Sequence, residues 1–146
     1  MLNDDATVIA MDMYKPSIID LHKDVDEQDI ENLIPILGDI TSKTELDDDS
    51  VDVMLMLNVY HHFNAARKVD EALSEIKRIT KPGGRVCVMD YKKQEVRHGP
   101  PYQMRVDSED VKKAFVDNGF KFISEDNEVG EDIPEGKSHY LLIFEK

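Results

Sequence analysis

Cysteine, basic side chains and long apolar runs are all scarce in this sequence of 146 residues. The one cysteine, Cys87, cannot form a disulfide within the chain and lies in an apolar run, which fits a reducing compartment and predicts a cytoplasmic protein. No apolar stretch approaches the ~18 residues of a membrane-spanning helix, and the acidic first residues do not have the layout of a signal peptide. We therefore expect a soluble protein with no membrane partner.

Positive charge is too sparse and too dispersed for a nucleic-acid surface. The chain has 18 Lys and Arg against 31 Asp and Glu, a formal net charge of −13. Binding to a phosphate backbone depends on clustered Lys and Arg that replace counterions, and these residues are scattered among acids here. The composition predicts no nucleic-acid partner.

Strand-like apolar runs alternate with segments of helical periodicity along most of the chain. This alternation is typical of a parallel sheet with helices on both of its faces. We predict strands at 7–12, 33–37, 53–57 and 85–90, and helices at 16–31, 65–79 and 108–118. Two closing runs, 120–124 and 139–144, flank an acidic loop without room for a helix, so we expect them to pair antiparallel. The prediction is a single α/β domain, residues 1–146, with a Rossmann-like, mainly parallel sheet.

Several of these segments carry more specific signals. Residues 53–57 are apolar on both alternating faces, which predicts a central strand covered on both sides. Pro16 favours a helix start with Ser17 as its cap. The acid run 47–49 lies in a polar link and predicts an exposed loop rather than a metal site, because adjacent side chains diverge.

Polar side chains follow three of the predicted strands at the points where they end. Asp12 ends the first strand, Asp39 follows the second, and Asn58 follows the third. Because parallel strands end along one edge of a sheet, these groups can converge on one crevice. Taken singly, each also fits a turn former or a helix cap, and that alternative stays open at this point.

Three stretches carry a resemblance to a known family. They are ILGDI, then LDDDSVDVMLMLNVYHHF, then LSEIKRITKPGGRVCVMDYKK. In this order they resemble the class I S-adenosylmethionine-dependent methyltransferases, particularly the branch that methylates quinones and related small molecules. The resemblance covers essentially the whole chain. It implies S-adenosylmethionine as cofactor and a small molecule as methyl acceptor.

The resemblance also implies roles for six cofactor-binding residues. Asp12 would accept hydrogen bonds from both ribose hydroxyls, and Asp39 would accept one from the adenine amino group. Two side chains would cover the adenine faces, and a backbone segment would run beside the sulfonium. The full set is Asp12, Met13, Asp39, Ile40, Leu57 and Asn58, with Met13 and Ile40 at the adenine and the last two at the sulfonium.

His61 and His62 are the candidate catalytic residues. Adjacent histidines point in different directions, so we do not expect them to share a metal ion without a third ligand at suitable spacing. Two interpretations stay open. A histidine ring can be packed or hydrogen-bonded as part of the loop, or an imidazole can take a proton from an acceptor hydroxyl.

A glycine-rich turn is the feature of this family that the sequence lacks. The family opens with a strand, a glycine-rich turn and a helix, and none of the seven glycines here lies in such a unit. We therefore expect the chain to correspond to the family from its second strand onward, which leaves apolar edges on strands 7–12 and 53–57. These edges could pair directly, accept a strand from another chain or copy, or belong to a longer molecule. The same expectation leaves an alternative function open, a non-catalytic interaction or oligomerisation module.

Overall fold

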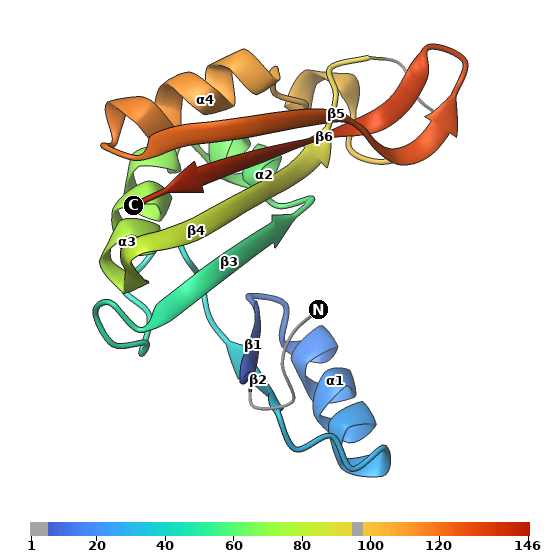
Figure 1. Ribbon diagram of the computed structural model, residues 1–146. Coiled ribbons are helices and arrows are strands. Elements are labelled where there is room, and N and C mark those ends of the chain that lie inside the picture. The colour runs from blue at the N-terminus through green and yellow to red at the C-terminus, as the bar shows by residue number, and fades with distance from the viewer. Residues whose placement is uncertain (1–5, 95–97) are drawn as a thin grey trace. The chain divides into compact units, whose positions relative to one another are not determined.

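The computed structural model describes residues 6–94 and 98–146. The chain divides into two compact units, residues 1–44 and 45–146, and each unit is described by itself. Figure 1 labels the helices and strands of both. That residues 1–146 form one domain stays a prediction.

The first unit is a strand, a helix and a second strand. β1 (Val8–Asp12) and β2 (Leu33–Leu37) pair parallel in register, with Val8 opposite Leu33 and Asp12 opposite Leu37. α1 (Lys15–Glu27) connects them and buries Ile18 (Figure 1). Both strands were predicted from sequence to within one residue.

The start and end of α1 differ from the prediction. The helix begins at Lys15, with Pro16 in its first turn, so Ser17 lies inside the helix and is not its cap. The residue before the helix is Tyr14, whose backbone N–H donates to Asp12 Oδ1 at 2.8 Å. The helix ends at Glu27 rather than near residue 31, because Asp29 adopts a left-handed backbone with φ 54°.

The second unit contains a mixed four-stranded sheet. Its strands are β3 (Val51–Leu57), β4 (Thr80–Tyr91), β5 (Lys121–Ile133) and β6 (Gly136–Glu145), in the order β3-β4-β6-β5. β3 and β4 are parallel, whereas β6 is antiparallel to both β4 and β5. The predicted α/β class and the closing antiparallel pair are confirmed. The acidic segment between the last two predicted strands is part of a long hairpin rather than a loop.

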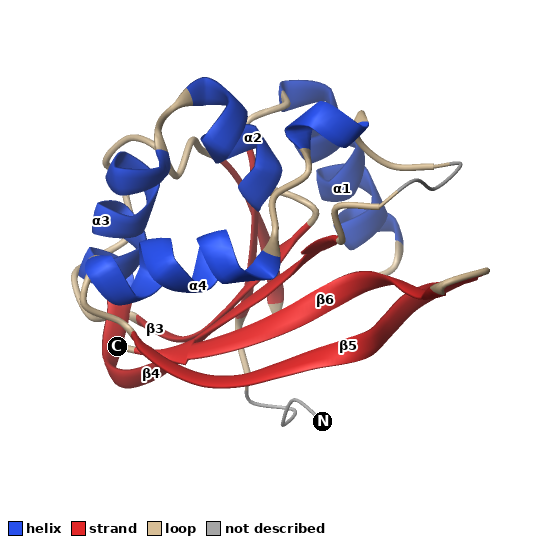
Figure 2. Ribbon diagram, turned by 90° about the horizontal axis from the view of Figure 1, so that it is seen from above, coloured by secondary structure: helices blue, strands red, loops and turns tan. Residues whose placement is uncertain are grey.

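Helices cover one face of this sheet. They are α2 (Tyr60–Ala66), α3 (Val69–Ile79) and α4 (Ser108–Asp117), with the short 3-10 helix η1 (Tyr102–Met104), and Figure 2 shows α2 to α4 on the same side of the strands. Inward-facing residues of β4 and β6 meet them in a core that includes Leu73, Ile76, Phe115 and Phe144. The rings of Phe115 and Phe144 stack with centroids 4.1 Å apart.

β3 is an edge strand, and its prediction as a central, doubly covered strand was wrong. Val53, Leu55 and Leu57 alternate along it and are 61, 64 and 53 % exposed. Periodicity shows that a side chain is apolar, but it does not show which segment covers it. β1 and β3 belong to different sheets.

The predicted helix 65–79 is two helices. α2 ends at Ala66 and α3 begins at Val69, because Arg67 adopts a left-handed backbone with φ 58°. Ala65 and Ala66 are therefore exposed and Val69 is half-buried, whereas Ala72, Leu73, Ile76 and Ile79 of the predicted apolar stripe are buried. No glycine or proline marks this break in the sequence.

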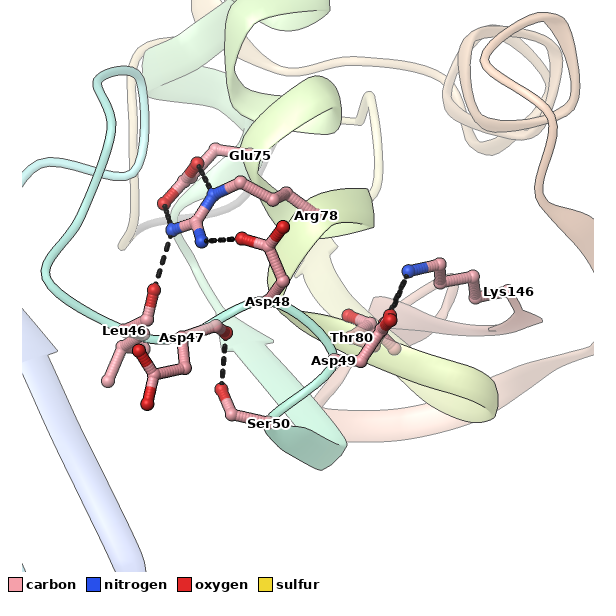
Figure 3. A network of polar contacts seen from close by, with 9 residues as sticks. All are labelled: Leu46, Asp47, Asp48, Asp49, Ser50, Glu75, Arg78, Thr80 and Lys146. Atoms are coloured by element: carbon pink, nitrogen blue, oxygen red, sulfur yellow. Dashed lines mark hydrogen bonds and ion pairs between the residues drawn. The ribbon is translucent and has the colours of Figure 1, made fainter.

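The acid run 47–49 forms an exposed loop, as predicted, and cationic side chains hold it in place (Figure 3). Arg78 donates to both carboxylate oxygens of Glu75, to Asp48 and to the Leu46 carbonyl. The hydrogen bonds to Glu75, which have the largest effect, and to Asp48 raise the pKa of the Arg78 guanidinium. Lys146 donates to Asp49 and to the carbonyl of Thr80, so the loop is tied to the end of α3 and to the C-terminal strand.

Candidate functional site

The carboxyl ends of β1 and β2 lie side by side in the first unit. The N–H of Gly38 donates to the carbonyl of Asp12 at 3.0 Å. A Cβ at Gly38 would lie 2.6 Å from Met11 Sδ, so a glycine allows this close approach. The structure therefore brings Asp12 and Asp39 to one edge of the β1–β2 pair, as the strand pattern predicted.

Both carboxylates shape the turns that follow their strands. Asp12 Oδ1 accepts the Tyr14 N–H, and Asp39 Oδ1 accepts the N–H and the hydroxyl of Thr41 at 2.9 and 2.8 Å. These bonds support the turn-forming interpretation of each residue. They are compatible with ligand binding, because an ionised carboxylate has about four lone-pair positions for hydrogen bonds.

The other predicted cofactor residues occupy different environments. Met13 is exposed, whereas the side chain of Ile40 is buried, so Met13 is the more accessible of the two predicted adenine contacts. Leu57 and Asn58 lie in the second unit, at the end of β3. The structure groups Asp12, Met13, Asp39 and Ile40 in one unit, and Leu57 and Asn58 in the other.

Asn58 makes a sharp turn between β3 and α2. Its backbone is left-handed, with φ 55°, and its N–H donates to the carbonyl of Met89 on β4 at 2.8 Å. Its side-chain Oδ1 lies 3.0 Å from Nε2 of His139 on β6. The turn that leaves β3 is thus held by β4 and by β6, the next two strands of the sheet.

His61 forms a buried pair with Asp90, the residue near the end of β4. Asp90 accepts the backbone N–H of His61 at 3.1 Å, and its Oδ1 lies 2.9 Å from His61 Nδ1. The two residues are only 4 and 2 % exposed. Because an ionised carboxylate only accepts hydrogen bonds, Nδ1 carries the hydrogen, and in the neutral ring Nε2 has the lone pair. The geometry supports the structural interpretation of His61 and leaves Nε2 able to accept a proton.

His62 differs from its neighbour. It is exposed, and its ring lies 4.2 Å from that of His61, centroid to centroid, at 39°. Among residues 6–94 and 98–146, no three His, Cys, Asp or Glu side chains form a group that could hold a metal ion.

Asp90 and His139 were not among the predicted site residues. Asp90 lies where a predicted strand ends, so the rule that selected Asp12 would have selected it as well. His139 gave no such signal, because it lies near the start of a strand and meets Asn58 only through the order of strands in the sheet. Burial is the main cause that lowers its pKa.

Comparison with known proteins identifies the family. A family model described as "Methyltransferase domain" matches residues 1–88, which is more than half of the chain. The chain therefore belongs to this family of methyltransferase domains. No curated protein matches it.

Solved methyltransferases share the fold. A SAM-dependent methyltransferase from Aquifex aeolicus has a TM-score of 0.85 at 23 % identity, with 99 % of this chain and 71 % of that chain covered. A putative type 11 methyltransferase from Sulfolobus solfataricus has a TM-score of 0.68 at 25 % identity, with 94 and 69 % covered. A putative methyltransferase from Haloferax volcanii, solved in complex with a methyltransferase activator, has a TM-score of 0.72 at 22 % identity, with 96 and 72 % covered.

These matches confirm the predicted class, a class I S-adenosylmethionine-dependent methyltransferase, and support S-adenosylmethionine as its cofactor. The quinone-methylating branch and the absent first strand stay predictions. No helix in the described part of the chain is long and apolar enough to cross a membrane.

Proposed function

We propose that this methyltransferase domain acts on a small molecule and holds the nucleoside half of S-adenosylmethionine between Asp12 and Asp39. The observation that carries the proposal is the placement of two carboxylates at the carboxyl ends of paired parallel strands. Vicinal ribose hydroxyls and an adenine amino group are hydrogen-bond donors, which carboxylates match. Hydrogen bonds to a charged acceptor contribute about 1.5–3 kcal/mol each.

The family resemblance assigns the groups around the reacting atoms to residues at and after the end of β3. S-adenosylmethionine supplies an electrophilic methyl group on its sulfonium. The backbone at Leu57 and Asn58 would lie beside it, where carbonyl dipoles suit a positive charge. His61 Nε2 would accept the proton of an acceptor hydroxyl, and Asp90 would stabilise the resulting imidazolium through the Nδ1–H bond. The exposed Met13 would cover adenine, and Ile40 would contribute its backbone amide.

Calorimetry of the full chain with S-adenosylhomocysteine, the demethylated cofactor, tests the nucleoside site. We expect Asp12→Ala and Asp39→Ala each to weaken binding at least tenfold, because each change removes charge-assisted hydrogen bonds worth about 1.5–3 kcal/mol. Adenosine should bind with an affinity similar to that of the whole compound if the nucleoside half carries the interaction.

Asp26→Ala is the matched control for both variants. Asp26 is an exposed acid on α1, so the control removes the same charge from the same unit away from the strand ends. Equal binding by wild type, Asp12→Ala and Asp26→Ala, or no binding by the wild type, would contradict the proposed site.

The exposed strand β3 favours a second candidate function, an oligomerisation module that carries out no methyl transfer. Val53, Leu55 and Leu57 are more than half exposed on a strand whose second edge is unpaired in its sheet. Exposed apolar edge strands are templates for pairing with another chain. A second copy of this chain is the partner that this proposal implies.

A further inference from the structure

We propose that His139 is a positioning residue that fixes the carboxamide of Asn58, so that Asn58 offers only N–H donors to the methyl acceptor. The proposal rests on the proposed function, because it places Asn58 beside the methyl-transfer site. It goes further by selecting a chemical class of acceptor. That class bears oxygen atoms able to accept a hydrogen bond, such as a carboxylate or carbonyl next to the methylated group.

A chain of hydrogen bonds fixes the proton positions on His139. The backbone N–H of Glu131 donates to Ser138 Oγ at 2.8 Å. Ser138 Oγ lies 2.6 Å from His139 Nδ1, and His139 Nε2 lies 3.0 Å from Asn58 Oδ1. Because a carboxamide oxygen only accepts, Nε2 carries the hydrogen, and in the neutral ring Nδ1 accepts the hydrogen of the Ser138 hydroxyl.

The protonated Nε2 in turn sets the orientation of Asn58. Nε2–H donates to Asn58 Oδ1 at 3.0 Å, which occupies the oxygen of the carboxamide and leaves its NH₂ group for other partners. The reversed carboxamide would place an N–H donor against the Nε2–H donor. The observed orientation of Asn58 is thus the one that pairs with a donor at His139 Nε2.

The surroundings of His139 favour the neutral ring. Burial is the largest effect on it and lowers its pKa, and the nearby cations Arg105 and Lys92 act in the same direction. Asp90 and Glu131 act in the opposite direction with smaller effect than burial. The Tyr91 ring packs against the imidazole, with centroids 4.0 Å apart. The ring is therefore held in place by packing as well as by its hydrogen bonds.

The hydrogen-bonding groups of Asn58 determine which methyl acceptors this site favours. An ammonium group brings only donors and would face another donor at Asn58, whereas a carboxylate brings only acceptors and would be satisfied there. The chain as a whole has a net charge of −13, so long-range attraction alone favours a cation. A preference for an anion near Asn58 would therefore report the local donor rather than the overall charge.

The first experiment measures the apo protein by ¹⁵N NMR at pH 7.5. We expect the His139 ring to be in the Nε2–H tautomer, with Nε2 hydrogen-bonded. The Nδ1–H tautomer, or a ring protonated at this pH, would overturn the proposal. This measurement needs no cofactor, so its result is independent of the proposed methyl transfer.

The second experiment compares benzoate and benzylammonium as matched probes of the site. In the wild type we expect benzoate to shift the Asn58 side-chain NH₂ signals at concentrations at least fivefold lower than benzylammonium does. Asn58→Asp should reverse this preference, because it keeps the bond from His139 and removes the donors. His139→Ala should abolish the preference, since the freed carboxamide can turn either way. In both variants the preference is measured from the ligand-induced shifts of backbone amides next to residue 58, because Asn58→Asp has no side-chain NH₂ signal.

His139→Gln is the conservative variant that separates positioning from folding. A glutamine side chain can donate an N–H to Asn58, so we expect it to restore at least half of the preference for benzoate. Equal shifts by the two probes in the wild type, or an unchanged preference in His139→Ala, would overturn the proposal. If the proposal fails in this way but the wild type still binds S-adenosylhomocysteine, the proposed function is unaffected. If the wild type does not bind S-adenosylhomocysteine but His139 has the expected tautomer, only the proposed function is contradicted.

Discussion

At the scale of single residues, the Asp90 carboxylate accepts hydrogen bonds from several buried or half-buried groups. It accepts the backbone N–H of His61, the ring Nδ1–H of His61 and the backbone N–H of Tyr91, all within 3.1 Å. A buried donor that loses its acceptor costs about 1–3 kcal/mol, and opening a buried pair costs more than opening an exposed one. This carboxylate thereby joins the end of β4 to the start of α2.

We therefore expect Asp90→Ala to lower the free energy of unfolding by about 3 kcal/mol, as measured by urea denaturation. Asp90→Asn should lower the free energy of unfolding by a smaller amount, because its amide oxygen can still accept the Nδ1–H of His61. Asp52→Ala is the control, since Asp52 is exposed and its ion pair with Lys81 lies at the surface. A loss in Asp90→Ala no greater than in the control would show that the pair contributes little.

At the scale of helices and strands, the break between α2 and α3 depends on one strained residue. Arg67 caps α2 with φ 58°, and its N–H and that of Lys68 donate to carbonyls of the last turn of α2. A left-handed backbone costs a residue with a side chain about 1–2 kcal/mol, and glycine adopts it without this cost.

Arg67→Gly should accordingly raise the free energy of unfolding by about 0.5–1 kcal/mol, after allowance for the greater entropy of glycine in the unfolded chain. A higher urea midpoint with an unchanged slope would show this gain. Arg67→Ala keeps a Cβ and should give no such increase. Destabilisation by Arg67→Gly would mean that the Arg67 side chain, rather than its backbone, stabilises the end of α2.

At the scale of the whole molecule, an acidic chain carries an exposed apolar strand. The net charge of −13 opposes association between copies, and the open side of β3 favours it. The balance between these two effects depends on ionic strength, because salt screens the repulsion and leaves apolar burial intact.

If β3 mediates self-association, light scattering of the full chain should show a dimer or larger species whose share grows with added salt. Leu55→Lys should shift this species to the monomer while leaving the urea midpoint within about 0.5 kcal/mol of wild type, since Leu55 is exposed. Met56→Lys, the neighbouring residue on the buried face, should instead unfold the second unit. A wild type that is monomeric at every salt concentration would exclude the oligomerisation module.

The sequence predicted most of the elements because each has a local cause. Residues 33–37 were predicted as a strand with the observed bounds, and the end of α4 was marked by Gly119, whose φ is 83°. The sequence failed at Arg67 and at the 125–138 hairpin, since neither a left-handed arginine nor a polar strand held by its partner has a local signal.

Some contacts of the candidate site were likewise predictable from local sequence, and others were not. The sequence by itself determined that Asp12 and Asp39 lie where strands end, because an apolar run and the turn that follows it are formed by residues next to each other in the chain. The tertiary structure alone decided that His61 meets Asp90 and that Asn58 meets His139, 29 and 81 positions apart. Such pairs form only when strand order brings distant segments together, and strand order is set by the packing of the whole sheet rather than by any local sequence.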